Sequence, residues 1–171
     1  MLSEKEIDPL IERAFNESPD FVTWFLSKTS YKNVNAKCVW SRSDHPWGKI
    51  AFEYEDPKTG GISEIVRDSE TDVLVVLESE QGKRFAFHIE NKLADGSFTL
   101  YQPEMYKPRA RAWLKSSKHG LYTEFETVLF SPIAFYKKNM EAARKFDRYI
   151  TYEEASIFIP ELQDNCKWPV A

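Results

Sequence analysis

Three charged side chains stand at the ends of two apolar runs, where a buried strand would carry no charge. Asp72 opens the run 73–77, and Glu90 and Lys92 close the run 84–92. Polar residues and a glycine separate the two runs, which predicts two adjacent strands joined by a tight turn. All three charged groups therefore belong to one predicted hairpin.

The two-residue period of a strand brings these groups together. Glu90 and Lys92 project to the same face, and His88 would share it. If the hairpin pairs in register from its turn, Asp72 lies beside Glu90 at the open end. Asn91 points to the opposite face, although its backbone carbonyl lies near the same edge. A histidine on an inward strand face is more often packed and hydrogen-bonded than catalytic, so we interpret His88 as structural.

The chemistry of this cluster is that of metal-dependent hydrolysis. Two neighbouring carboxylates such as Asp72 and Glu90 repel each other, which raises one pKa unless a cation lies between them. A hard divalent ion with oxygen ligands relieves that repulsion. The ammonium group of Lys92 can hold or polarise a water molecule or an oxyanion beside the ion.

Composition sets broad limits on the class of protein. The chain has 171 residues, which fits one domain with a core large enough to be stable alone. Its net charge of −4 gives no overall attraction to nucleic acid. It has no run of about 18 apolar residues and its N-terminal segment is charged, so we expect a cytoplasmic protein without a membrane partner.

Hydrophobic periodicity predicts helices and strands on both sides of the hairpin. Helices are predicted at 7–28, in two pieces divided before Pro19, and from Ser131 to about Tyr149. Further strands are predicted at 34–40, 50–54, 62–69 and 125–130. A last short helix is expected at Thr151, with Glu154 at the capping-box position.

A further helix is expected after the hairpin. Gln102 would cap it with Pro103 at its first position, and Pro108 would interrupt or restart it. Gln102 and Tyr106 are four residues apart and would lie on one face.

The segment 107–119 is basic and contains no acidic residue. Clustered lysine and arginine side chains attract phosphates and position nucleic acid without reading its sequence, although a solvated helix face is the usual alternative. Because the segment begins directly after Tyr106, we interpret it as a DNA contact. Its basic residues are Lys107, Arg109, Arg111, Lys115 and Lys118.

Four other residues could in principle reach this site. Glu12 lies on the first predicted helix, and Glu64 and Glu70 lie just upstream of Asp72. Each is interpreted as solvent-exposed, and whether any of them adds to the site stays open. His45 precedes a proline in a polar turn and is interpreted as a surface residue rather than a ligand.

Taken together, these motifs resemble the PD-(D/E)XK nuclease superfamily. Asp72, the hairpin and the triplet 90–92 follow its signature, and Gln102-x-x-x-Tyr106 is similar to the element after the core in RecB-type members. Thr71 precedes Asp72 where the signature has proline. The close match covers about a fifth of the chain, and the flanking helices and strands extend it loosely to most of the domain.

The resemblance implies an α/β fold with a restriction-endonuclease-like core, a central mixed β-sheet flanked by helices. It implies one nuclease-like domain over 1–171 that acts as an Mg²⁺-dependent deoxyribonuclease. It implies Mg²⁺ or Mn²⁺ as cofactor, with these ligands: Asp72, Glu90 and the carbonyl of Asn91. The implied catalytic set adds residues that assist the water, support the site or touch the DNA backbone: Lys92, Gln102 and Tyr106.

Two other functions compete with this one. A non-catalytic subunit on the same fold could serve a larger nucleic-acid-processing or defence complex, and the acidic net charge favours it. A metal hydrolase of another class, such as a nucleotide phosphatase, is disfavoured because no His/Asp metal motif is present. The sequence leaves three questions open. They are whether the substrate is DNA or RNA, whether the action is that of an endonuclease or an exonuclease, and whether the protein is a monomer, a homodimer or part of a larger complex.

Overall fold

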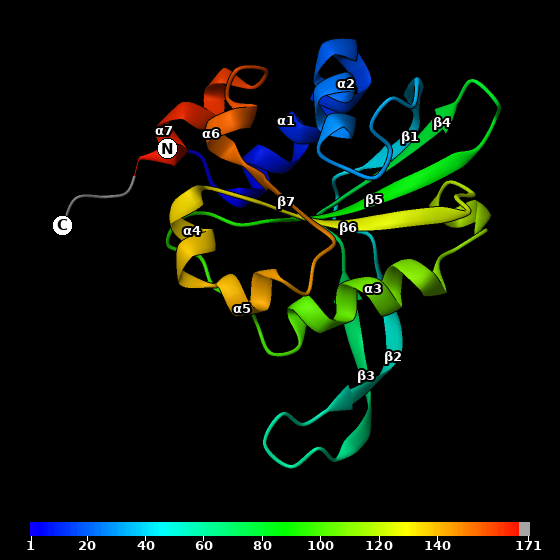
Figure 1. The fold of residues 1–171 in the computed structure, drawn as a ribbon, viewed down its shortest axis with the longest axis vertical. Coiled ribbons are helices and arrows are strands. Elements are labelled where there is room, and N and C mark those ends of the chain that lie inside the picture. The colour runs from blue at the N-terminus through cyan, green and yellow to red at the C-terminus, as the bar shows by residue number, and fades with distance from the viewer. Residues whose placement is uncertain (168–171) are drawn as a thin grey trace.

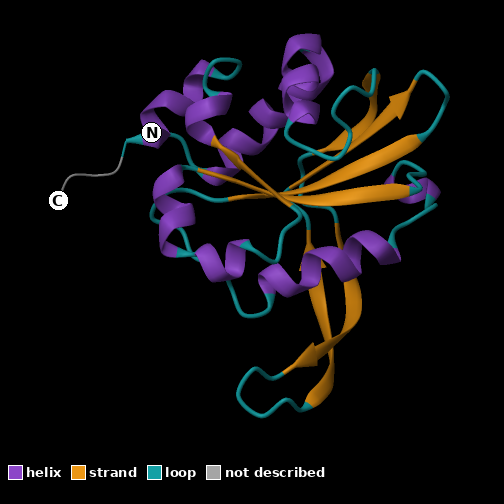
Figure 2. Ribbon diagram, in the orientation of Figure 1, coloured by secondary structure: helices purple, strands orange, loops and turns teal. Residues whose placement is uncertain are grey.

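A five-stranded mixed sheet runs through the centre of the protein, with helices on both faces (Figure 1, Figure 2). The computed structural model describes residues 1–167. The sheet order is β1 (Ala36–Arg42), β4 (Val73–Ser79), β5 (Arg84–Asn91), β6 (Glu124–Ser131) and β7 (Arg148–Thr151). β1, β4 and β5 are antiparallel neighbours, whereas β5, β6 and β7 run parallel. The predicted α/β class with a mixed central sheet is confirmed.

The helices divide between the two faces of this sheet. One face carries α1 (Glu4–Glu17), α2 (Pro19–Ser27), α6 (Tyr152–Ala155), η2 (Pro160–Leu162) and α7 (Gln163–Cys166). The other carries α3 (Gln102–Ala112), η1 (Ser117–His119), α4 (Ile133–Lys138) and α5 (Met140–Ala143). No helix within the described residues is long and apolar enough to cross a membrane.

The apolar runs of β4 and β5 are continuous because both faces of these strands are buried. One set of side chains packs under α1 and α2, and it includes Val73, Val75, Phe87 and Ile89. The alternate set faces α3, and it includes Leu74, Val76 and Ala86. His88 and Glu90 have the parity of Ala86, so they point towards α3 rather than towards α1.

The β4–β5 register is the one that the tight turn predicts. Pairing runs from Glu78 opposite Arg84 to Val73 opposite Ile89. The next position outward therefore sets Asp72 beside Glu90.

A separate two-stranded antiparallel arm projects from the sheet (Figure 1). It consists of β2 (Trp47–Glu55) and β3 (Ile62–Glu70), and its base packs against α3. The Tyr101 ring lies edge-on to Tyr54, with ring centroids 4.8 Å apart. Because β3 ends two residues before Asp72, the arm adjoins the candidate site.

Two sequence predictions are wrong at the level of elements. The helix predicted to reach Tyr149 ends at Lys138, and after the short α5 the chain enters β7, which pairs with β6. Ile150 of β7 is fully buried, so tertiary pairing overrides the local helical pattern. Pro108 does not interrupt α3, which continues through it to Ala112.

Other expected features are present. The first helical segment is in two pieces, with Pro19 in the first turn of α2. Thr151 caps α6 and accepts a hydrogen bond from the backbone N–H of Glu154. These features depend on local capping chemistry, which the sequence contains in full.

Candidate metal centre

Asp72 and Glu90 lie at one end of the β4–β5 pair, and both carboxyl groups are buried. Oδ2 of Asp72 accepts a hydrogen bond of 2.8 Å from the backbone N–H of Asn91. Burial raises the pKa of Asp72 well above its usual value, and the negative charges of Glu90 and Asp8 raise it further. Burial also raises the pKa of Glu90, although the charge of Lys92 opposes this. A bound cation would relieve the repulsion in this carboxylate pair.

Three side chains hold the carboxylate of Glu90. The ammonium of Lys92 lies 3.0 Å from its Oε1 atom. Nε2 of Gln102 donates to the same oxygen at 2.5 Å, and the hydroxyl of Tyr106 donates to Oε2. The Tyr106 hydroxyl also accepts a 3.4 Å hydrogen bond from the backbone N–H of Asp72. The structure therefore brings together all five side chains named from the sequence as the catalytic set.

Local structure explains how α3 presents Gln102 and Tyr106. The prediction of Gln102 as the cap is wrong by one residue, because Tyr101, with φ +63°, is the N-cap and Gln102 is the first residue of the helix. Oε1 of Gln102 accepts a 3.0 Å hydrogen bond from the backbone N–H of Thr99, which directs its Nε2 atom at Glu90. Tyr106 follows one helical turn later on the same face.

Asn91 projects to the opposite face of β5, as the strand period predicts. Its Nδ2 atom donates to Oδ1 of Asp8 at 2.8 Å, and its Oδ1 atom accepts from the hydroxyl of Tyr152. Asp8 belongs to α1 and is 1% exposed. The helix before the sheet therefore reaches the site through a residue that sequence reasoning did not select.

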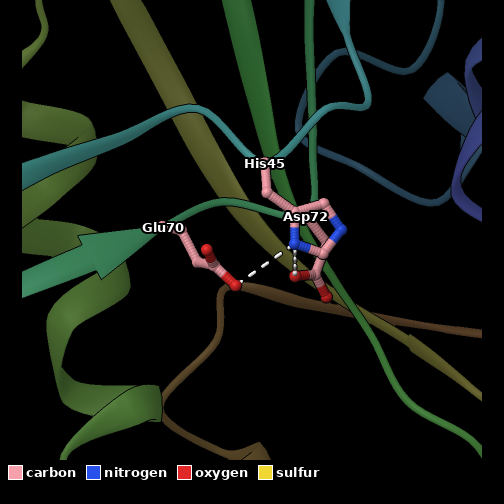
Figure 3. Close-up of side chains that lie close together, drawn as sticks. All are labelled: His45, Glu70 and Asp72. Atoms are coloured by element: carbon pink, nitrogen blue, oxygen red, sulfur yellow. Dashed lines mark hydrogen bonds and ion pairs between the residues drawn. The ribbon is translucent and has the colours of Figure 1, made fainter. Parts of the chain in front are cut away.

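His45 lies in the site, so its interpretation as a surface residue is wrong. Its Nδ1 atom is 3.2 Å from Oε1 of Glu70 and 3.7 Å from Oδ1 of Asp72 (Figure 3). Its Nε2 atom lies 2.8 Å from Oδ2 of Asp8. The hydrogen bond to Asp8 raises the pKa of His45 to about 9, against the effect of burial, and Asp72 contributes to the increase.

The sequence left open whether Glu12, Glu64 or Glu70 adds to the site. Of these three, Glu70 reaches the cluster. Ligand atoms of His45, Glu70 and Asp72 all lie within 4.8 Å of one another. Glu12 instead accepts a 2.8 Å hydrogen bond from Ser41, and Glu64 is exposed on the arm opposite Glu53.

A cleft of about 990 Å³ opens above these groups. Its walls come from the start of α1, the loop before β2, the end of β3 and the inner side of α3. Its polar lining includes His45, Glu70, Asp72, Lys92, Gln102 and Arg109. Asp72 and Lys92 therefore face this open cleft, whereas Glu90 is fully buried.

Only some basic side chains of the segment 107–119 are exposed to solvent. Arg111, Lys115 and Lys118 are exposed, and Lys107 is half-buried and pairs with Asp147 at 3.1 Å. Arg109 is 1% exposed, so its expected place on an exposed basic face is wrong. It lies on the buried side of α3, where its partners are the hydroxyls of residues that precede Asp72.

The donor set fits a divalent cation. Carboxylate oxygens with one imidazole nitrogen suit Mn²⁺ and, through the oxygens, Mg²⁺. A protonated imidazole is not a ligand, so binding through His45 requires release of its proton.

The fold and site define an α/β protein with a buried acidic pair, a neighbouring lysine and an open cleft. Comparisons with protein-family models, with curated proteins and with solved structures found no match to the chain. The functional conclusion therefore depends on the geometry of the site.

Proposed function

We propose that the protein is a metal-dependent nuclease with a restriction-endonuclease-like core, and that it hydrolyses DNA phosphodiester bonds. The observation that carries this proposal is the convergence of Asp72 and Lys92, which line an open cleft, with the buried carboxylate of Glu90. Support for the core comes from the mixed sheet, the preceding helix α1 and the helix α3 that follows the charged triplet.

Asp72 and Glu90 would hold Mg²⁺ or Mn²⁺, with the backbone carbonyl of Asn91 completing the expected set. His45 and Glu70 are additional donors next to Asp72. When bound, such an ion supplies charge stabilisation to a phosphoryl oxygen and lowers the pKa of water. The protein supplies buried carboxylates with raised pKa values, so a cation that binds them would displace any proton they hold.

Lys92 acts as a charged donor in this proposal. Burial is the largest influence and disfavours its charged form, but the charges of Glu90 and Glu4 and the hydrogen bond to Glu90 together outweigh burial and raise the pKa of Lys92. An ammonium that keeps its proton at neutral pH orients the attacking water or stabilises the phosphoryl oxyanion rather than accepting a proton.

Gln102 and Tyr106 are positioning residues. Both donate to Glu90, and burial raises the pKa of Tyr106 well above its usual value, so the phenol keeps its proton. Their hydrogen bonds fix the rotamer of Glu90 from a rigid helix.

DNA would enter the cleft with its backbone near the exposed end of α3. Arg111, Lys115 and Lys118 are exposed at this end and do not line the cleft, so their positive charge would attract phosphates outside it. Such contacts position the substrate and leave sequence specificity to other features.

Cleavage of plasmid and of single-stranded oligonucleotides with Mg²⁺ or Mn²⁺ tests the proposal. Asp72→Asn, Glu90→Gln and Lys92→Met should each lower kcat by about 10²-fold or more, because each removes charge at the reacting phosphate. Glu12→Gln, on α1 outside the cluster, is the matched control. Circular dichroism of each variant confirms folding, and wild-type rates in all three folded site variants would contradict the assignment.

A non-catalytic subunit remains the second candidate, and one observation favours it. Both carboxylate oxygens of Glu90 already have protein donors, so its position does not require an ion. Calorimetric titration with Mn²⁺ separates the two functions. Absence of binding to the folded wild-type protein would favour the subunit, whereas binding that Asp72→Asn abolishes would favour the nuclease.

A further inference from the structure

The guanidinium of Arg109 is buried at the edge of the cleft with one nitrogen unpaired. Its Nε atom donates to Oγ1 of Thr71 at 2.8 Å, and its Nη1 atom donates to the hydroxyl of Ser69. Nη2 is buried and has no hydrogen-bond partner within residues 1–167. The residue is 1% exposed and lines the cleft. An unpaired polar group on a buried cation is costly unless a ligand completes it.

A chain of hydrogen bonds fixes the direction in which this guanidinium points. His88 is fully buried, and its two ring nitrogens contact the neutral hydroxyls of Thr71 and Tyr122, an arrangement that suits a neutral imidazole. The hydroxyl of Tyr122 donates to the carbonyl of Ala110 and therefore accepts from Nε2 of His88, 3.0 Å away. Nδ1 of His88 is then an acceptor, and the hydroxyl of Thr71 donates to it at 2.9 Å.

Thr71 therefore uses its proton on His88 and offers only lone pairs to Arg109. The Thr71 hydroxyl therefore contacts both His88 and Arg109, which a proline at this position could not do. It holds Nε of Arg109 in one orientation, which leaves Nη2 as the free donor.

The guanidinium lies close to a residue that contacts the carboxylate cluster. The guanidinium carbon lies 4.1 Å from the centre of the Tyr106 ring, whose hydroxyl contacts Glu90. Ser69 and Thr71, the hydrogen-bond partners of the guanidinium, flank the cluster residue Glu70 in sequence and lead directly into Asp72. The hydrogen-bond partners of Arg109 are neutral hydroxyls, and within residues 1–167 no hydrogen bond occupies its Nη2 atom.

We propose that Nη2 of Arg109 binds an oxygen of the substrate phosphate held at the carboxylate cluster, and that Thr71 positions it. The identity of the anion as a nucleic-acid phosphate rests on the proposed nuclease function. Carboxylates at the cleft repel a phosphodiester, and a preorganised guanidinium offsets that repulsion. Its role differs from that of the exposed basic residues, because it acts at the reacting phosphate and not along the DNA backbone.

The first test compares Arg109→Met with Arg13→Met, an exposed arginine outside the cleft that pairs with Glu161. With an oligonucleotide substrate, Arg109→Met should lower kcat by about 10²-fold with a much smaller change in KM, as loss of an oxyanion donor does. Arg13→Met should match the wild type. A folded Arg109→Met variant with wild-type kcat would overturn the proposal.

The second test measures anion binding without cleavage. Inorganic phosphate, with Mg²⁺ and at constant ionic strength, should raise the thermal midpoint of the wild type and of Arg13→Met but not that of Arg109→Met. If the wild type cleaves no nucleic acid, the proposed function fails while this measurement still decides the anion site. Absence of a phosphate effect on the wild type would overturn the anion site.

If Arg109→Met does not fold, Thr71 provides the remaining comparison. Thr71→Val removes the hydroxyl that orients the guanidinium, and Thr71→Ser restores it. We expect Thr71→Val to lower kcat and abolish the phosphate effect, and Thr71→Ser to recover both. Equal kcat and equal phosphate effects in these folded variants would contradict the positioning role.

Discussion

Nε2 of His45 lies 2.8 Å from Oδ2 of Asp8, and this contact joins the loop before β2 to the buried side of α1. The other oxygen of Asp8 accepts from Nδ2 of Asn91. Nδ1 of His45 faces Glu70 and Asp72. One imidazole therefore connects three carboxylates that would otherwise repel one another.

This contact predicts a pH dependence of stability in the metal-free protein. The pKa of His45 is raised to about 9 in the folded state from 6.5, so its stabilisation is fully present below pH 6.5 and is lost as pH rises through about 9. His45→Gln should lower the free energy of unfolding at pH 6 by about 1 kcal/mol, since the ring is partly exposed to solvent. Urea unfolding in EDTA at pH 6 and pH 10 measures this difference. If the free energies of unfolding of the wild type and the variant differ by the same amount at pH 6 and pH 10, the prediction is contradicted.

Asp72 should show the opposite behaviour, because the folded protein disfavours its charge. With a pKa raised above 3.8, its ionisation opposes folding as pH rises above that value. Asp72→Asn keeps an acceptor for the backbone N–H of Asn91 and should stabilise the metal-free protein at pH 8 by about 1 kcal/mol or more. The same variant should no longer be stabilised by Mn²⁺. Thermal unfolding with and without Mn²⁺ measures both effects.

Asp95→Asn, in an exposed loop, is the matched control for Asp72. It should change neither the metal-free stability nor the response to Mn²⁺. If Asp72→Asn destabilises the metal-free protein at pH 8, the carboxylate pair is not the source of repulsion that its burial indicates.

The Asp72–Glu90 pairing could be predicted because its determinants are local. A tight turn sets the register of β4 and β5, and a two-residue period then places every side chain. The same holds for Thr151 and Glu154 at the start of α6. These relationships need only a short stretch of chain.

His45 and Asp8 could not be predicted, because their contact joins residues 37 positions apart through a loop with no periodic pattern. Arg109 was misplaced for a different reason. A run of basic residues suggests a solvated face, and no local pattern showed that one of them turns towards the sheet. β7 was missed because its parallel pairing with β6 depends on contacts that only the folded chain provides.

The exposed basic residues of α3 and the segment after it should contribute to substrate affinity rather than to catalysis. Replacement of Arg111, Lys115 and Lys118 by glutamine should weaken DNA binding for all sequences and leave kcat unchanged. The slope of log affinity against log salt should fall by about 1 for each phosphate that the variant no longer neutralises. Fluorescence anisotropy across a salt series measures this slope.

A control triple variant carries the same substitutions at exposed basic residues outside this segment: Arg13→Gln, Lys32→Gln and Lys37→Gln. It changes the net charge equally, so it separates a local contact from a general charge effect. An equal decrease of affinity in the two triple variants would contradict a DNA path along the end of α3.

Gly120 closes the turn between η1 and β6, where the backbone has φ +85°. A Cβ atom there would lie 2.7 Å from Cγ2 of Val76 and 3.0 Å from the Trp40 ring. Gly120→Ala should therefore destabilise the protein by about 2–4 kcal/mol, through backbone strain together with overpacking. Gly60 also has positive φ, +69°, but a Cβ there meets nothing within 4 Å, so Gly60→Ala should cost about 1–2 kcal/mol. Urea unfolding of both variants measures the difference, and equal destabilisation would show that the clash with Val76 and Trp40 is relieved by movement of the turn.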